Sequence, residues 1–196
     1  MSASQDTSFA RLVSLACHDL RTPLATVHGF ARTISRTGDL QEPQSRYVEM
    51  IEAASGQLAE LLEELSLAAR IESGRYDPAI QEVDSVQLVR SAVEPLDAGL
   101  VSVEGEGAPV QVDVAAAERA LRALARCALR HGGLEHVSAR VSGAEVAISP
   151  ITPASAPVVM GEDLRDLGAA IAGRALRALG GGLELDGETL RVRLPA

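Results

Sequence analysis

Two long runs of helical periodicity, joined by one turn, most constrain the fold of this chain. In residues 8–36 and in residues 44–72, apolar side chains recur mainly at steps of three and four, the spacing of one helix face. Residues 36–43 contain Gly, Asp and Pro and predict a turn. The two predicted stripes are Phe9, Val13, Ala16, Leu20, Val27, Phe30 and Ile34, and Tyr47, Met50, Ile51, Ala54, Leu58, Leu61, Leu65 and Ala68.

Two helices of this length predict an α-helical hairpin. A hairpin alone buries one stripe on each helix, whereas two hairpins form a four-helix bundle with a closed core. We therefore expect a homodimer through residues 8–72; the alternative is that the hairpin packs on the C-terminal part of its own chain. Residues 72–78 contain Gly and Pro and predict a linker, which divides the chain into domains 1–75 and 76–196.

After residue 79, short strands alternate with helices. This order predicts helices on one face of a mixed sheet, an α+β two-layer sandwich. Residues 150–163 are rich in Pro and predict a loop. The predicted helices are 85–96, 114–131 and 163–181, and the predicted strands are 100–105, 109–114, a hairpin over 136–149 and a hairpin over 183–195.

Charge and composition exclude several kinds of partner. The net charge is -9, with about -4 in residues 1–73 (six Arg, ten acidic residues) and about -5 in the remainder (twelve Arg, seventeen acidic residues). Since neither part is basic, we expect no nucleic acid and no anionic membrane as partner. No segment approaches the roughly 20 apolar residues of a membrane span. Cys17 and Cys127 form no CxxC pair, and we expect a soluble, cytoplasmic protein.

His18 is the first candidate for chemistry. Because a helix turns about 100° per residue, His18 lies roughly 200° from Ala16 and from Leu20 and points away from the predicted stripe. Asp19 can accept a ring N–H, which would fix the tautomer and raise the basicity of the other ring nitrogen. Thr22 shares the face of His18. Geometry alone also allows a surface histidine without a function.

The stretch HDLRTPL, residues 18–24, resembles the H box of bacterial two-component sensor histidine kinases and matches it at all seven positions. The resemblance implies a dimerisation and histidine-phosphotransfer domain over about residues 5–75. It implies that His18 carries the phosphoryl group, that Asp19 assists its transfer, and that Thr22 could position a water to hydrolyse a partner's phospho-aspartate. Arg21 is the arginine of the motif.

The order of elements after residue 79 resembles the ATP-binding domain of the same kinases, but the first nucleotide motif is missing. The helix 114–131 should carry asparagines that hold Mg²⁺ and phosphates. The chain contains no Asn, and Ala123 and Cys127 stand at the matching positions. Arg126 and Arg130 lie beside them and cannot ligate a metal.

Two further motifs of that domain also fail. Pro150 stands where the resemblance requires the adenine-binding Asp, and Asp166 replaces the first glycine of the phosphate loop, where its carboxylate would repel phosphates. His28, His131 and His136 share no metal spacing. We therefore expect no ATP binding, no cofactor and no metal ligands in this degenerate ATPase-like domain.

Three functions remain open. The first is a histidine phosphotransferase that relays phosphoryl groups between His18 and the aspartate of response-regulator receiver domains, with an upstream histidine kinase as a possible donor. The receiver would supply its own Mg²⁺. The second is a catalytically silent pseudokinase scaffold that binds a receiver or a kinase. The third is an ATP-dependent sensor histidine kinase with a divergent nucleotide site. The residues expected to dock a receiver are Leu15, Arg21, Val27 and Arg32.

Overall fold

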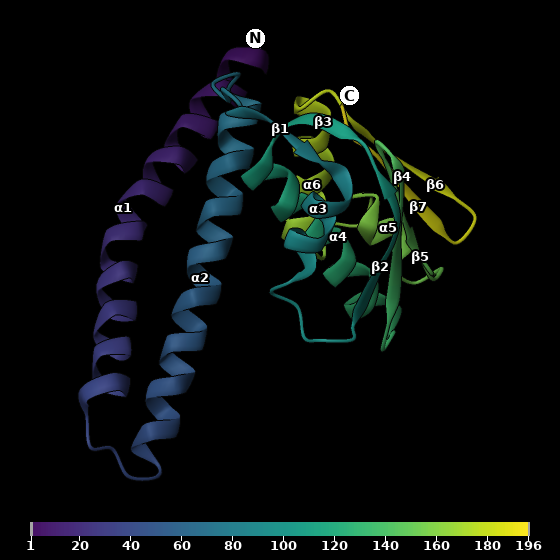
Figure 1. Ribbon diagram of the computed structural model, residues 1–196. Helices are drawn as coiled ribbons and strands as arrows, with labels where there is room; N and C mark the ends of the chain where they lie inside the picture. The colour runs from purple at the N-terminus through teal and green to yellow at the C-terminus, as the bar shows by residue number, and fades with distance from the viewer. Residues whose placement is uncertain (1, 196) are drawn as a thin grey trace. The chain divides into compact units, whose positions relative to one another are not determined.

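The chain divides into two compact units, Met1–Arg75 and Tyr76–Ala196 (Figure 1). The computed structural model describes residues 2–195, and the side chains of residues 2–9, 11, 12 and 37 lie outside that description, including the Phe9 of the predicted stripe. The first unit is a helical hairpin and the second an α/β sandwich with a mixed sheet, which confirms the predicted fold class. Within the described residues, no helix is long and apolar enough to cross a bilayer.

The hairpin consists of α1 (Ser2–Thr37) and α2 (Gln44–Glu72), which pack against each other (Figure 1). Pro23 lies inside α1 and has no N–H to donate to the carbonyl of Asp19 four residues earlier. At the end of α2, Gly74 adopts a φ of 64° and the amide of Arg75 donates to the carbonyl of Arg70 at 2.9 Å. Gly74 therefore closes the helix at the start of the predicted linker.

The large apolar side chains of the predicted stripes are exposed in the single chain. Leu20, Val27 and Leu58 are 54%, 50% and 52% exposed. The buried positions follow the predicted ones by a single residue: Cys17 follows Ala16, and Ala31 follows Phe30. Each helix thus carries two neighbouring heptad stripes. The exposed one, here called the outer stripe, contains Leu20, Val27, Phe30 and Ile34 on α1 and Tyr47, Ile51, Leu58, Leu61 and Leu65 on α2.

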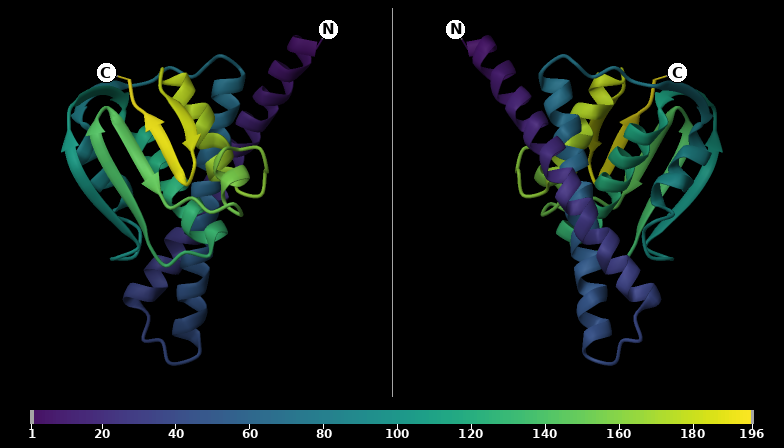
Figure 2. Two further views of the ribbon diagram at one scale, coloured as in Figure 1. Left: turned by 90° about the vertical axis from the view of Figure 1, so that its right-hand side faces the viewer. Right: turned by 90° about the vertical axis from the view of Figure 1, so that its left-hand side faces the viewer.

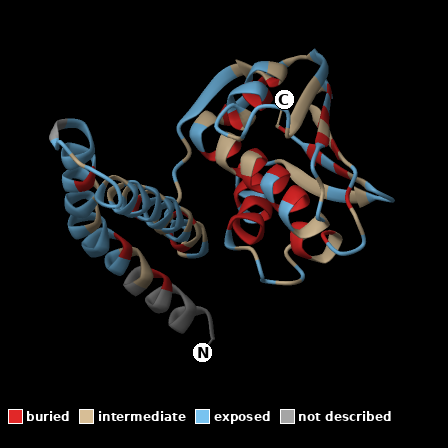
Figure 3. Ribbon diagram, turned by 90° about the horizontal axis from the view of Figure 1, so that it is seen from below, coloured by how far each residue is buried: buried red, intermediate tan, exposed pale blue. Residues whose placement is uncertain are grey.

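Figure 3 shows the same contrast across the molecule: exposed residues dominate the hairpin, whereas buried residues concentrate in the helices and strands of the second unit. The buried positions of α1 are Ala10, Cys17 and Ala31, and those of α2 are Ser55, Leu67 and Ala69. Most of these residues are small. The hairpin therefore buries little apolar volume within one chain.

The second unit is built on a five-stranded sheet in the order β2-β4-β5-β7-β6 (Figure 2). β2 runs parallel to β4, and the remaining neighbours are antiparallel. The predicted hairpins β4–β5 and β6–β7 are confirmed. A separate two-stranded sheet pairs β1 with β3. The strands are β1 (Ile80–Asp84), β2 (Val101–Gly107), β3 (Pro109–Asp113), β4 (Val137–Gly143), β5 (Glu145–Ser149), β6 (Gly182–Asp186) and β7 (Thr189–Arg193).

Helices α3 (Ser85–Val93), α4 (Val114–Gly132) and α6 (Leu167–Ala178) cover one face of this sheet (Figure 2). Along β4, buried Val137, Ala139 and Val141 alternate with more exposed neighbours, as expected for a strand with one covered face. Each of the three helices begins after an aspartate whose carboxylate accepts backbone N–H bonds of the first turn. These N-caps are Asp84, Asp113 and Asp166.

Two elements of the second unit were not predicted. The first is β1, whose residues 80–82 are all exposed and lack the alternation that marks a half-buried strand. The second is α5 (Ala156–Val159), which lies within the predicted loop. Val158 and Val159 are fully buried, and α5 packs against α4 and α6. The Pro-rich segment is therefore part of the packed domain.

Candidate functional site: an exposed histidine and a modified helix pair

His18 lies on the exposed surface of α1. Its side chain is 76% exposed and that of Asp19 is 68% exposed. Nδ1 of His18 lies 3.2 Å from Oδ1 of Asp19. If Nδ1 carries the ring proton and donates it to Asp19, Nε2 presents a lone pair, and Nε2 makes no hydrogen bond to a described residue. The arrangement suits a nucleophile at Nε2.

Three of the other predicted site residues share the face of His18. Leu15, Arg21 and Thr22 are three or four residues from the histidine and are exposed. Thr26 Oγ1 donates to the carbonyl of Thr22 at 3.1 Å, one turn after the break in hydrogen bonding at Pro23. This face presents an imidazole, a guanidinium, a hydroxyl and an apolar side chain to solvent.

The last two predicted docking residues lie elsewhere on α1. Val27 is nine residues after His18, about 180° around the helix, and belongs to the outer stripe. Arg32 lies about 21 Å from His18 along the helix axis. Its Nε atom lies 3.9 Å from Oε1 of Glu52 on α2, while its side chain stays 62% exposed. The predicted residues therefore do not form one cluster around the imidazole.

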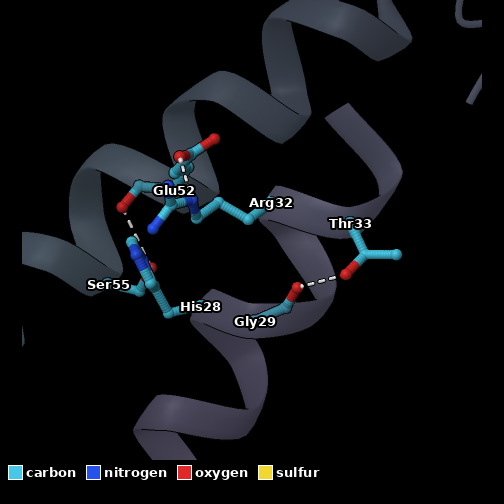
Figure 4. A network of polar contacts seen from close by, with 6 residues as sticks. All are labelled: His28, Gly29, Arg32, Thr33, Glu52 and Ser55. Atoms are coloured by element: carbon cyan, nitrogen blue, oxygen red, sulfur yellow. Dashed lines mark hydrogen bonds and ion pairs between the residues drawn. The ribbon is translucent and has the colours of Figure 1, made fainter. Parts of the chain in front are cut away.

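A polar network joins α1 to α2 at His28 (Figure 4). Nδ1 of His28 lies 2.9 Å from Oγ of Ser55, which is 3% exposed and donates to the carbonyl of Glu52 at 3.0 Å. The serine hydroxyl is thus left to accept from the imidazole. Thr33 Oγ1 donates to the carbonyl of Gly29 at 2.8 Å (Figure 4). His28 therefore helps to fix the pairing of the two helices.

In the second unit, the positions matched to metal and phosphate ligands lie on the buried face of α4. Ala123 is 5% exposed and Cys127 is fully buried, whereas Arg126 and Arg130 are exposed. Burial raises the pKa of Cys127 to about 12, with the carboxylate of Asp166 adding to the rise and Arg130 opposing it. Neither Ala123 nor Cys127 offers the oxygen ligand that Mg²⁺ prefers.

Asp166 occupies the N-terminus of α6. Its Oδ1 atom accepts a hydrogen bond from the amide of Ala169 at 3.0 Å. A helix N-terminus favours an anion because its first N–H groups are unpaired. Here the chain's own carboxylate holds that position, two residues before the buried Gly168.

Asp166 also brings two residues of α4 into one cluster. Its Oδ2 atom lies 3.4 Å from Nε2 of His131, and Cys127 precedes His131 by about one helical turn. One ligand atom from each of Cys127, His131 and Asp166 lies within 4.8 Å of the other two. This cluster was not predicted from the sequence. Its signal in the sequence was the spacing of four residues between Cys127 and His131, because the third residue, Asp166, precedes a different helix.

Comparisons with known proteins match parts of this chain to histidine kinases. Residues 10–74 match the His Kinase A (phospho-acceptor) domain, HisKA. The probable sensor histidine kinase TcrY of Mycobacterium tuberculosis is 35% identical over 72 residues, 37% of this chain and 15% of TcrY. Histidine protein kinase DivJ of Caulobacter vibrioides is 29% identical over 119 residues, 58% of this chain and 20% of DivJ. The chain thus spans a fifth or less of the length of these relatives.

The fold agrees with the sequence matches. The crystal structure of full-length ShkA in complex with AMPPNP superposes with a TM-score of 0.67 and 21% identity, covering 94% of this chain and 45% of that chain. The comparisons therefore show that residues 10–74 form a HisKA phospho-acceptor domain and that the chain resembles histidine kinases. The fold resembles a histidine kinase core, in which a HisKA hairpin is followed by an ATPase-like domain.

Proposed function

We propose that this chain is a phosphorelay histidine phosphotransferase, which passes phosphoryl groups between His18 and the aspartate of response-regulator receiver domains without using ATP. One contrast carries the proposal. The HisKA hairpin keeps an exposed imidazole 3.2 Å from its carboxylate. The ATPase-like domain has Ala123 and Cys127 at the positions for metal ligands and Asp166 at the helix N-terminus.

The geometry at His18 supports transfer in both directions. With the proton on Nδ1, the Nε2 lone pair attacks the phosphorus of an aspartyl phosphate, and the bond from phosphorus to the aspartate oxygen breaks. The receiver regains its carboxylate, and the positive charge that develops on the imidazole is stabilised by Asp19. No proton has to leave Nε2 first, and the reverse attack by a receiver carboxylate returns the phosphoryl group.

The proposal that the chain does not use ATP rests on how phosphates must be positioned and their charge neutralised. Phosphoryl transfer from a nucleotide depends almost entirely on holding the phosphates and neutralising their charge with Mg²⁺. A buried thiol on α4 and a carboxylate at the start of α6 supply neither function. A receiver domain that brings its own Mg²⁺ would remove the need for a metal at this position in the chain.

The exposed surface around His18 suits a receiver. Leu15 is 57% exposed and offers apolar area, and Arg21 offers a positive charge toward an acidic active site. We also propose that Thr22 positions a water for hydrolysis of the receiver's phospho-aspartate. Val27 and Arg32 lie away from this face. Arg32 would therefore contact a receiver only if the receiver extends along α1 toward the interhelical loop.

We further propose that two copies of the chain pair through the outer stripe. The stripe leaves large apolar side chains of both helices about half exposed, which is costly in water. A second hairpin would cover them and complete a four-helix bundle.

The test is transfer from a labelled receiver. Receiver domains from the source organism, each phosphorylated with radiolabelled acetyl phosphate, are mixed with the full chain and with His18→Ala. We expect at least one receiver to label the wild-type chain with an acid-labile phosphate and to leave His18→Ala unlabelled. His136→Ala, which removes an exposed histidine of the second unit, should be labelled like wild type.

Two results would overturn the proposal. Receivers that bind the wild-type chain and His18→Ala equally, with no label passed, would indicate a scaffold. Labelling of His18 from Mg²⁺-ATP would indicate a kinase with a divergent nucleotide site.

A further inference from the structure

The cluster of Cys127, His131 and Asp166 has no part in the transfer chemistry at His18. It lies wholly within the second unit, between the C-terminal half of α4 and the first residue before α6. Cys127 is fully buried, and the side chains of His131 and Asp166 are 16% and 12% exposed. Three side chains that commonly ligate metals thus converge in a nearly enclosed place.

We propose that Cys127, His131 and Asp166 form a three-ligand site for a divalent transition metal ion, and that the ion is Zn²⁺. Zn²⁺ accepts sulfur, imidazole nitrogen and carboxylate oxygen together. The hard cations Mg²⁺ and Ca²⁺ require oxygen ligands and do not fit this set. Three protein ligands leave a fourth tetrahedral position for water or another small ligand.

The spacing of the ligand atoms fits a tetrahedral ion. Ligands at about 2.0–2.3 Å from a tetrahedral Zn²⁺ lie roughly 3.3–3.8 Å from one another. Nε2 of His131 and Oδ2 of Asp166 are 3.4 Å apart, and all three ligand atoms lie within 4.8 Å of each other. Cys127 and His131 are four residues apart on α4, so they share a face without any change of the helix.

The imidazole of His131 gives a second, independent indication. Its Nε2 atom is buried and has no hydrogen-bond partner, although Oδ2 of Asp166 lies at 3.4 Å. The pair is close enough for ionic attraction but does not have hydrogen-bond geometry. A buried polar atom without a hydrogen-bond partner destabilises the folded chain. A metal ion between the nitrogen and the carboxylate would satisfy it.

The carboxylate is already oriented for this role. Oδ1 of Asp166 is held by the amide of Ala169 at 3.0 Å, which leaves Oδ2 directed at His131. Such an outer hydrogen bond on a ligating carboxylate is a regular feature of metal sites. On binding, the ion replaces the thiol proton of Cys127, which goes to solvent, and the thiolate and carboxylate together balance the two positive charges.

The experiment is a titration of the full chain, freed of metal with a chelator, with Zn²⁺ in a calorimeter and with Co²⁺ in a spectrophotometer. We expect one Zn²⁺ per chain. We also expect a thiolate-to-cobalt charge-transfer band together with the visible bands of tetrahedral Co²⁺. Cys127→Ala should remove the charge-transfer band, and His131→Ala and Asp166→Asn should each weaken Zn²⁺ binding at least about tenfold.

Matched variants separate ligation from folding. Asp166→Asn keeps a good N-cap residue, so α6 should fold. Asp84→Asn makes the same change at the N-cap of α3 and Cys17→Ala removes the other thiol, and neither should alter binding. No binding of Zn²⁺ by wild type, or binding that none of the three variants weakens, would overturn the site and leave an ion pair only. His18→Ala should bind Zn²⁺ normally, so failure here is distinct from failure of the phosphotransferase proposal.

Discussion

Nδ1 of His18 lies 3.2 Å from Oδ1 of Asp19, the next residue in the chain, and both side chains face solvent. The carboxylate can therefore hold the imidazole in one tautomer without shielding the other nitrogen from a partner.

Asp19→Asn should slow phosphoryl transfer at least about tenfold, because the amide cannot stabilise the charge that develops on the imidazole. The measurement is the rate of label transfer from a phosphorylated receiver under single-turnover conditions. Asp39→Asn removes an exposed carboxylate of the same hairpin and should have the wild-type rate. Equal rates for the two variants would exclude a role of Asp19 in the transfer step.

Thr22→Ala should reduce the loss of phosphate from a phosphorylated receiver and leave transfer to His18 intact, since Thr22 is exposed one turn from the imidazole. The readout is inorganic phosphate released over time. Thr22→Ser keeps the hydroxyl and should keep the release. Unchanged release by the alanine variant would contradict the proposed water-positioning role.

Leu58→Asp should convert a dimer to a monomer. Leu58 is 52% exposed in the single chain, and covering that exposed half contributes about 1 kcal/mol per copy, so the dimer should weaken at least about tenfold. Light scattering during size-exclusion chromatography measures the mass. Leu164→Asp makes the same change at a leucine of the second unit that is 71% exposed, and should remain a dimer. A monomeric wild type would contradict the pairing itself.

Mg²⁺-ATP at 1 mM should not stabilise the chain measurably. A dissociation constant of 1 mM or weaker corresponds to at most about 0.4 kcal/mol of added stability at this concentration. Thermal unfolding with and without nucleotide checks this, with Mg²⁺-AMP as the control for non-specific effects. A clear upward shift specific to ATP would show that Cys127 and Asp166 do not prevent nucleotide binding.

Gly105→Ala should destabilise the second unit more than Gly133→Ala, by at least about 1 kcal/mol. Both glycines have positive φ, 106° and 62°, and both substitutions strain the backbone. A Cβ at Gly105, however, would overlap the carbonyl oxygen of Val141 on the neighbouring strand, whereas a Cβ at Gly133 would meet open space. Urea unfolding of the two variants measures the difference. Equal losses of unfolding free energy would mean that β2 and β4 shift to accommodate the added methyl group.

The hairpin and its exposed histidine could be predicted from the sequence because both depend on local spacing. Helical periodicity located α1 and α2, and the separation of His18 from the apolar stripe predicted its exposure. Turn glycines and alternating residues similarly located the hairpins β4–β5 and β6–β7. None of these features needs information from a distant part of the chain.

The features that were missed depend on tertiary contacts. Periodicity identifies apolar stripes, but it does not say which positions face the neighbouring helix of the same chain, where Cys17 is buried and Leu20 is exposed. β1 is recognised only through its pairing with β3. The cluster at His131 needs the first residue before α6, and no spacing along one helix could reveal it.

The offset between the two heptad stripes sets a limit on how this hairpin can change length. One residue inserted in α1 ahead of Val27 would turn the following helix by about 100°. Val27 and Phe30 would then take the inward positions now held by His28 and Ala31, which are half-buried and buried. Bulky side chains would push the helices apart, and the face offered to a second copy would lose them. Changes of α1 by whole heptads would preserve both faces, whereas single-residue changes would displace their side chains.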